Sequence, residues 1–217
     1  MSAQMQKRLF ITFEGGDGAG KTTQIRRLSQ FLTQQGIDHI TTREPGGAPF
    51  SEKLRDVMLG EQGRDAQPLT QALLMTAARF EHVTKVIQPA LEKGQWVLSD
   101  RFLDSTTVYQ GFALGVPQPT IMQLHQMVLG NFKPDITFVF RLRPHLAEKR
   151  GSSRQQNHYD LKDLAFRQRV MQGFDQLIED NPLRCIGIDA EQSVEHITAF
   201  IREALVHHGV ILDKTPS

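Results

Sequence analysis

The chain has 217 residues, which favours a single domain (1–217) with a sizeable core. Its 25 Lys and Arg against 24 Asp and Glu give a formal net charge of +1, so the total charge points to neither a nucleic-acid nor an acidic-membrane partner. The single cysteine, Cys185, cannot form an intrachain disulfide, and no apolar run approaches the length of a membrane span or a signal-peptide core. We therefore expect a cytoplasmic protein with no membrane partner.

Apolar, β-prone runs alternate with helical periodicities along the chain. Strands are predicted at 9–13, 39–42, 96–99, 135–142 and 184–188. Helices are predicted roughly over 21–35, 50–59, 68–92, 119–130, 144–150, 161–179 and 193–207. This alternation predicts an α/β fold with a five-stranded parallel sheet and helices on both faces. Ligands in such folds bind beyond the carboxyl ends of the strands, so the polar residues there are the candidates for function.

A glycine-rich segment follows the first strand and opens the first helix. Its sequence, GGDGAGKT, fits G-x-x-x-x-G-K-[ST] and consists of Gly15, Gly16, Asp17, Gly18, Ala19, Gly20, Lys21 and Thr22. Glycines let backbone N–H groups turn toward an anion, and the helix adds the positive end of its dipole. Lys21 would act on the β/γ-phosphates of a nucleoside triphosphate, and the Thr22 hydroxyl would bind Mg²⁺. A glycine turn that binds nothing leaves the strand–loop–helix context unexplained.

Two further strands end in candidate site residues. After the third strand, Asp100 could bind a metal or its water beside a phosphate loop, and the Arg101 guanidinium suits phosphate oxygens. Surface ion pairs or a helix cap are the alternative for this pair. After the second strand, the segment TREPGG (42–47) places Glu44 at the edge of a rigid turn, although a plain turn explains its Pro and Gly equally well.

A polar insert at about 150–160 and its flanks carry a basic set: Arg150, Arg154, His158, Arg167 and Arg169. An arginine on a flexible cover could close onto a transferring phosphoryl group and neutralise developing charge. An ordinary solvated charged face explains the same residues.

Four segments in order, EGGDGAGKTTQ, TREPGG, LLMTAARFEH and SDRFLDSTTVYQG, resemble the thymidylate kinase family. The similarity extends from Leu9 to about Phe174, and SRQQNHYD followed by FRQRVMQGF is similar to the lid region of bacterial members. The resemblance implies a P-loop nucleoside monophosphate kinase fold with a short lid at about 150–160. It also implies a homodimer and the conversion of dTMP and ATP into dTDP and ADP with Mg²⁺.

Site residues follow from the resemblance as well. The substrate-binding residues it implies are Glu44, Arg55, Met75, Arg79, Arg101, Thr106 and Gln110. The catalytic residues it implies are Asp17, Lys21, Arg101 and Arg154, and the metal ligands are Thr22 and Asp100. Within these sets, Arg79 would reach the thymine edge, Arg101 the dTMP phosphate, and Arg154, in the lid, the transferred phosphoryl group.

The chain departs from the family pattern at four positions. Met75 stands where a phenylalanine usually stacks on thymine, His158 where a lid arginine is common, Arg141 where an acidic or amide residue is frequent, and Phe102 where a tyrosine is common. Methionine still offers a polarizable apolar face to a base. Substrates such as dUMP or another pyrimidine nucleotide therefore stay open.

A second class of function also stays open. A nucleotide-dependent switch or binding module would use the same glycine loop without transferring phosphate to a small acceptor. It accounts for GGDGAGKT but not for a second anion site made by Arg101, Arg79 and Glu44.

Overall fold

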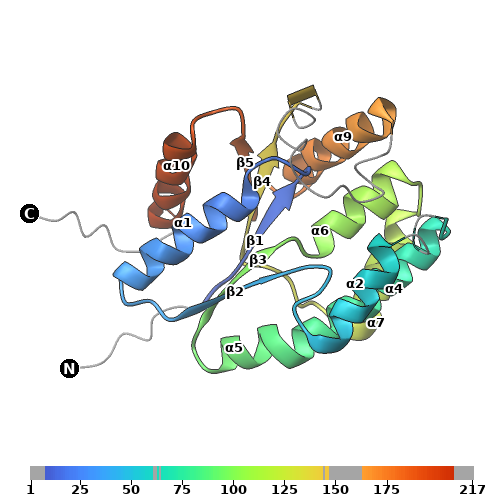
Figure 1. Cartoon of the computed structure of the whole chain (residues 1–217), viewed down its shortest axis with the longest axis horizontal. Coiled ribbons are helices and arrows are strands. Elements are labelled where there is room, and N and C mark those ends of the chain that lie inside the picture. Colours follow the sequence, from blue (N-terminus) through green and yellow to red (C-terminus); the bar gives the residue numbers. More distant parts are fainter. Residues whose placement is uncertain (1–7, 61–62, 64, 144, 147–162, 208–217) are drawn as a thin grey trace, which may run out of the picture.

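The computed structural model describes residues 8–60, 63, 65–143, 145–146 and 163–207 (Figure 1). The strands are β1 (Phe10–Gly15), β2 (His39–Arg43), β3 (Trp96–Asp100), β4 (Ile136–Arg141) and β5 (Cys185–Asp189). They form one sheet in the order β2-β3-β1-β4-β5, and every pairing is parallel. The predicted five-stranded parallel sheet is confirmed, with each strand close to its predicted bounds.

Helices cover both faces of this sheet. They are α1 (Lys21–Gln34), α2 (Pro49–Leu59), α4 (Pro68–His82), the π-helical η1 (Val83–Ile87), α5 (Gln88–Glu92), α6 (Leu103–Thr106), the π-helical η2 (Thr107–Ala113), α7 (Gln118–Leu129), α9 (Leu164–Asp180) and α10 (Val194–His207). In Figure 1, α1 and α10 lie on one side of the sheet, and α5, α6, α7 and α9 lie on the other. Helix α2 packs outside the sheet, against α4.

The strands are apolar because both of their faces are buried, as expected for a parallel sheet under two helical layers. Along β1 the side chains alternate between these layers. Ile11 and Phe13 join the apolar cluster of α1 and α10, whereas Phe10 joins the cluster of η1 and α5. Thr12 is fully buried and bonds to Thr137 on the neighbouring β4. Positions 10, 12 and 14 therefore share the α5–α6 side of β1.

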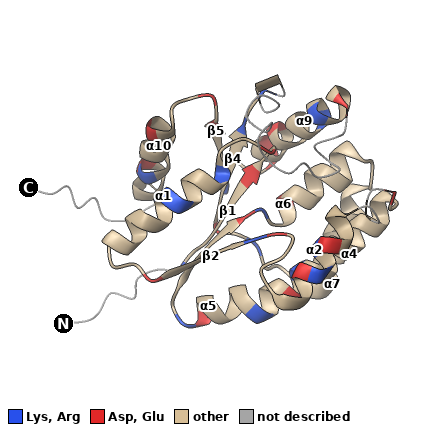
Figure 2. Cartoon of the chain, in the orientation of Figure 1, with Lys and Arg blue, Asp and Glu red and all other residues tan. Residues whose placement is uncertain are grey.

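Charge is confined to the carboxyl ends of the strands, as Figure 2 shows by the tan colour of most of each strand. The charged residue nearest each carboxyl end is Glu14 in β1, Arg43 in β2, Asp100 in β3, Arg141 in β4 and Asp189 in β5. Parallel pairing brings all five ends to one edge of the sheet. This edge is where ligands bind in α/β folds.

One helical region differs from the sequence prediction. The segment 103–113, for which no helix was predicted, forms α6 and η2. The predicted helix at 144–150 lies mostly outside the described residues, as does the insert at 150–160. Over the described ranges, no helix combines the length and apolar character needed to cross a membrane.

Candidate active site

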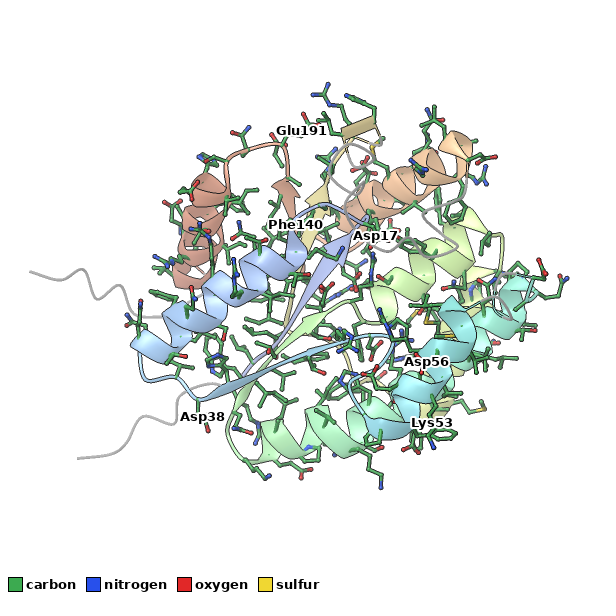
Figure 3. The ribbon with its side chains drawn as sticks, in the orientation of Figure 1. Asp17, Asp38, Lys53, Asp56, Phe140 and Glu191 are labelled. Carbon is green, nitrogen blue, oxygen red and sulfur yellow. The ribbon has the colours of Figure 1, made fainter. Side chains whose placement is uncertain are left out.

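A cleft of about 750 Å³ opens over the carboxyl ends of β1, β2 and β3. The predicted site residues that line it are Asp17, Gly18, Gly20, Lys21, Thr22, Glu44, Arg55, Met75, Arg79, Asp100, Arg101, Thr106 and Gln110. Gly15, Gly16 and Ala19 belong to the same loop but do not line the cleft. Arg154, with Arg150 and His158, lies outside the described residues. In Figure 3, Asp17 lies beyond the tip of β1, and Asp56 lies on α2, which borders the same cleft.

The glycine loop needs its glycines for two reasons. Gly15, Gly18 and Gly20 have φ angles of 128°, 75° and 93°, a region that residues with a Cβ rarely adopt. A Cβ on Gly15 would also lie 2.4 Å from the Phe140 carbonyl oxygen of β4. The loop can therefore pass close over the sheet with its backbone available to an anion.

Lys21 folds back over this loop. Its Nζ donates to the carbonyl oxygens of Gly15 at 3.1 Å and Gly16 at 2.9 Å. Burial lowers the pKa of Lys21 below its usual value, and the positive charge of Arg101 lowers it further. A phosphate in the loop would supply the negative charge that this buried ammonium lacks.

Thr22 and Asp100, the two predicted metal ligands, lie together. The Thr22 hydroxyl donates to Asp100 Oδ2 at 3.0 Å, although 78 positions separate the residues. They meet because β3 pairs with β1 in a register that sets Asp100 beside Phe13, just before the loop. No cluster of three or more His, Cys, Asp or Glu side chains suited to a metal occurs in the described parts of the chain. A hydroxyl and one carboxylate fit Mg²⁺, which takes most of its other ligands from phosphates and water.

Arg101 turns its side chain into the cleft through an unusual backbone. Its φ is 73°, in the left-handed region where a non-glycine residue is uncommon. The guanidinium donates to Asp17 Oδ1 at 3.0 Å and to Ser105 Oγ at 2.9 Å, and it lies 5.2 Å from the centre of the Tyr109 ring. Burial raises the pKa of Tyr109 to about 12, so its phenol stays neutral and can donate a hydrogen bond. The arrangement holds one cation beside the glycine loop.

The other end of the cleft is built around a buried ion pair. Arg79 Nε donates to Glu44 Oε2 at 2.8 Å, and Arg79 Nη2 donates to Thr106 Oγ1 at 2.8 Å. Arg79 and Glu44 are only 2% and 6% exposed. The Arg79 guanidinium also lies over the Phe102 ring, 5.1 Å from its centre. Among the described residues, Arg79 Nη1 has no hydrogen-bond partner, so a buried donor remains for an acceptor on a ligand.

His82 holds the far side of Glu44. Its Nδ1 lies 3.1 Å from Glu44 Oε1, and its Nε2 lies 2.6 Å from Thr42 Oγ1. Gly47 makes room for this contact, since a Cβ there would lie 2.3 Å from His82 Nε2 and 2.6 Å from Thr42 Oγ1. The TREPGG turn is thus more than a plain turn: it delivers Glu44 and leaves space for the histidine that orients it.

The helical segment 103–113 contributes two columns of side chains. Ser105 and Tyr109 lie four residues apart, as do Thr106 and Gln110, and all four line the cleft. Residues four apart lie on the same face of a helix, so both columns point to the same side. Sequence reasoning named Thr106 and Gln110 but missed Ser105 and Tyr109. The spacing of four residues could have identified Ser105 and Tyr109, but only if the segment had been predicted as a helix.

The remaining predicted residues have mixed outcomes. Arg55 donates to the Pro45 carbonyl at 2.7 Å and borders the cleft together with Met75. Arg169 does not line the cleft. Its Nε donates to the Ala113 carbonyl at 3.1 Å. Arg141, for which the sequence suggested no role, pairs with Asp175 of α9 at 2.6 Å.

Comparison with known proteins agrees with this geometry. The family model described as Thymidylate kinase matches residues 13–201. A thymidylate kinase of Magnetococcus marinus is 45% identical over 199 residues, covering 91% of this chain and 94% of the relative. One of Marinomonas sp. is 44% identical over 197 residues, covering 90% and 93%. The crystal structure of thymidylate kinase from Ehrlichia chaffeensis superposes with a TM-score of 0.76 at 34% identity, covering 92% of this chain and 98% of that one. The chain therefore belongs to the thymidylate kinase family.

Proposed function

We propose that this nucleoside monophosphate kinase transfers the γ-phosphoryl group of ATP to dTMP, giving ADP and dTDP with Mg²⁺. The observation that carries the proposal is one cleft whose two ends are lined by different polar groups. A triphosphate loop borders one end, and a buried arginine with a spare donor borders the other. A nucleotide-dependent switch, which only hydrolyses its bound nucleotide, would have no use for the end of the cleft around Arg79.

The donor end would hold ATP. The glycine loop and Lys21 would bind the β- and γ-phosphates, and Thr22 and Asp100 would hold Mg²⁺. Bound there, Mg²⁺ would neutralise charge on the transferring phosphoryl group. These residues orient the γ-phosphate toward the acceptor end of the cleft.

The acceptor end would hold dTMP. Arg101 would bind its phosphate, and Asp17, which accepts a hydrogen bond from Arg101 at 3.0 Å, would lie by the sugar and phosphate. The spare Nη1–H of Arg79 would donate to the carbonyl at position 4 of thymine. Cytosine carries a donor at that position, so a donor would face a donor in a buried site, which is costly. Met75, with Arg55, Thr106 and Gln110, would complete the base pocket.

The chemistry needs no covalent intermediate. An oxygen of the dTMP phosphate forms a bond to the γ-phosphorus while the bond to the β–γ bridging oxygen breaks, and ADP leaves. Catalysis then rests on alignment and on the cations that surround the transferring group. The one thiol, Cys185, is no candidate nucleophile, since burial raises its pKa to about 12 and it lies in β5, away from the cleft.

A coupled ADP-release assay over a panel of nucleoside monophosphates tests the proposal. We expect dTMP to be the best acceptor, dUMP to follow because it keeps the carbonyl at position 4, and dCMP and AMP to be poor. The Lys21→Ala variant is the control for contaminating kinase activity. Equal turnover of AMP and dTMP would replace the assignment with a general nucleotide kinase, and slow hydrolysis that ignores every monophosphate would favour a switch.

The resemblance adds three parts to the proposal. Arg154 would act from a lid at about 150–160, the protein would be a homodimer, and it would work in the cytoplasm. Light scattering of the purified protein tests the second part, with a mass near 49 kDa expected for two copies of a 24.6 kDa chain.

A further inference from the structure

Glu14, the penultimate residue of β1, has no part in the chemistry above. It lies directly before the glycine loop, but its side chain lies on the face of the sheet opposite to the one that α1 and α10 cover. Because side chains alternate along β1, Glu14 shares the α6 side with Phe10 and Thr12. Its carboxyl group is fully buried, and burial together with the nearby Asp104 carboxylate raises its pKa to about 8. A buried carboxyl group destabilises the fold unless hydrogen bonds satisfy it.

Both hydrogen bonds that the described structure gives Glu14 come from the segment that follows Arg101. Glu14 Oε1 accepts from the Phe102 backbone N–H at 2.7 Å, and Glu14 Oε2 accepts from the Ser105 hydroxyl at 2.5 Å. The two donors lie on either side of the start of α6. One carboxyl group therefore binds the turn that links β3 to α6 at two points.

The same two contacts fix Arg101. The Phe102 N–H belongs to the peptide group directly after Arg101. Arg101 has a φ of 73°, and contacts of this kind hold a residue in such a sparsely populated backbone region. Ser105 Oγ, which donates to Glu14, accepts from Arg101 Nη1 at 2.9 Å. Ser99 Oγ binds the other end of the same peptide group by donating to the Arg101 carbonyl at 2.8 Å. Glu14 thus reaches both the backbone and the guanidinium of Arg101.

We propose that Glu14 is a positioning residue for the acceptor phosphate, which it affects only through Arg101. A carboxyl group suits this task because it has two oxygens, one for each donor, in a fixed geometry. Arg101 arrives in the cleft already oriented, so less ordering remains to be done when an anion binds. The inference rests on the proposed function, since Arg101 is taken as the ligand of the dTMP phosphate.

A double-mutant cycle on dTMP binding tests the proposal. The variants are Glu14→Gln, Arg101→Ala and the two combined, and dTMP and ATP affinities are measured by titration calorimetry. An amide keeps only one acceptor oxygen, so Glu14→Gln must lose one of the two contacts. We expect Glu14→Gln to weaken dTMP binding about tenfold and to leave ATP binding unchanged. In the Arg101→Ala background the same substitution should cause no further loss, because residues that act as a unit are not additive.

Two control variants separate positioning from simple destabilisation. Glu195→Gln makes the same chemical change on the exposed face of α10. Thr198→Val removes a buried hydrogen bond to Gln24, again on α10. Neither should alter dTMP affinity, even where Thr198→Val lowers the unfolding temperature. Ser105→Ala removes both the side-chain contact to Glu14 and the hydrogen bond from Arg101. It should weaken dTMP binding as well and should have no further effect in the Arg101→Ala background.

Three results would overturn the inference. They are unchanged dTMP affinity in Glu14→Gln, an equal loss in the Arg101→Ala background, and a parallel loss of ATP affinity. If Glu14→Gln does not fold, the cycle of Ser105→Ala with Arg101→Ala decides by the same criteria. Failure of the proposed function is distinct, because the unaltered enzyme would then neither bind nor phosphorylate dTMP.

Discussion

The two ends of the cleft are built in different ways. The donor end is local: one run of eight residues, 15–22, supplies the loop and Lys21, and only Asp100 comes from elsewhere. The acceptor end gathers side chains from the β2–α2 turn, from α4, from the β3–α6 turn and from η2. The first end relies on backbone groups at a helix N-terminus. The second relies on side chains that other side chains hold.

This difference teaches where each end is vulnerable. In the acceptor end, Arg79, Glu44 and His82 form a buried chain that continues to Thr42. Removing one member of a buried ion pair costs about 3–5 kcal/mol, since the other charge stays buried without compensation. Substitutions there should affect folding and dTMP together. In the donor end, replacing the Lys21 side chain should affect turnover far more than folding.

The largest expected effect is at the donor end. Lys21→Ala should lower kcat by about two to three orders of magnitude or more, because the ammonium proposed to stabilise the transferring phosphates is lost. The fold should be kept, as judged by circular dichroism and by unchanged dTMP affinity. A purified variant that retained most of its turnover would contradict the reading of the loop.

At the acceptor end, Arg79→Lys should lower kcat/KM for dTMP about a hundredfold. Lysine cannot serve Glu44 and Thr106 and still present a third donor to the base, because it lacks the fork of a guanidinium. KM for ATP should be unaffected, and the preference for dTMP over dCMP should shrink. The control is Arg202→Lys on α10, which makes the same exchange beside Phe31 and should be neutral. An equal rise in both KM values would show that the two ends are not independent.

Two glycine substitutions test by protein stability whether the acceptor end depends on the space beside His82. Gly47 and Gly94 share a φ of 84°, but a Cβ at Gly94 would meet nothing within 4 Å, whereas one at Gly47 would collide with His82 and Thr42. Gly94→Ala should therefore cost only the backbone term, about 1 kcal/mol. Gly47→Ala should cost roughly 1–3 kcal/mol more. Urea unfolding of the two variants measures the difference, and equal costs would mean that His82 does not depend on that space.

Arg154 lies outside the described residues. If it closes onto the phosphoryl group during transfer, Arg154→Ala should lower kcat at least tenfold, about 1.4 kcal/mol, with little change in dTMP affinity. His158→Ala should be milder, because histidine is neutral much of the time at pH 7. Steady-state kinetics of both variants decide this, and an unchanged rate in Arg154→Ala would pass the role to Arg150 or another arginine.

The last prediction concerns Glu14, which precedes the glycine loop and contacts the segment after Arg101. Its pKa in the fold, about 8, lies above its ordinary value of 4.5, so the folded state holds this proton to a higher pH than the unfolded chain does. Its contribution to stability is fully present below pH 4.5 and is lost as the pH rises through 8. The contribution changes by up to about 1.4 kcal/mol per pH unit between these values.

Glu14→Gln should therefore flatten the fall in unfolding free energy between pH 5 and 8. Glu191→Gln is the control, because the hydrogen bond from Arg143 lowers the pKa of Glu191 and places its effect below that range. Chemical denaturation at several pH values measures both slopes. Parallel slopes for the parent and Glu14→Gln would contradict the raised pKa.

Much of the fold could be read from the sequence because its signals are local. Five apolar runs became the five strands, and helical periodicity located α1, α2, α4, α7, α9 and α10. The glycine loop could also be predicted from the sequence, since its pattern consists of consecutive residues. The helix at 103–113 was missed because Ser, Thr, Val, Tyr and Gly111 are poor helix formers. Packing outweighs that preference: a Cβ on Gly173 of α9 would lie only 3.0 Å from Val108 and 3.1 Å from Phe112.

For the site, the sequence by itself determined which chemical groups follow each strand: Lys21 and Thr22, Glu44, and Asp100 with Arg101. Arg79, Thr106 and Gln110 entered only through resemblance to a family. The tertiary structure alone decided the strand order, and with it that Asp100 meets Thr22, that His82 lies behind Glu44, and that Glu14 accepts from the Phe102 N–H. The reason is physical. A local pattern encodes periodicity and backbone freedom, whereas contacts across about 40 to 90 residues arise only when buried apolar surface fixes how the elements pack.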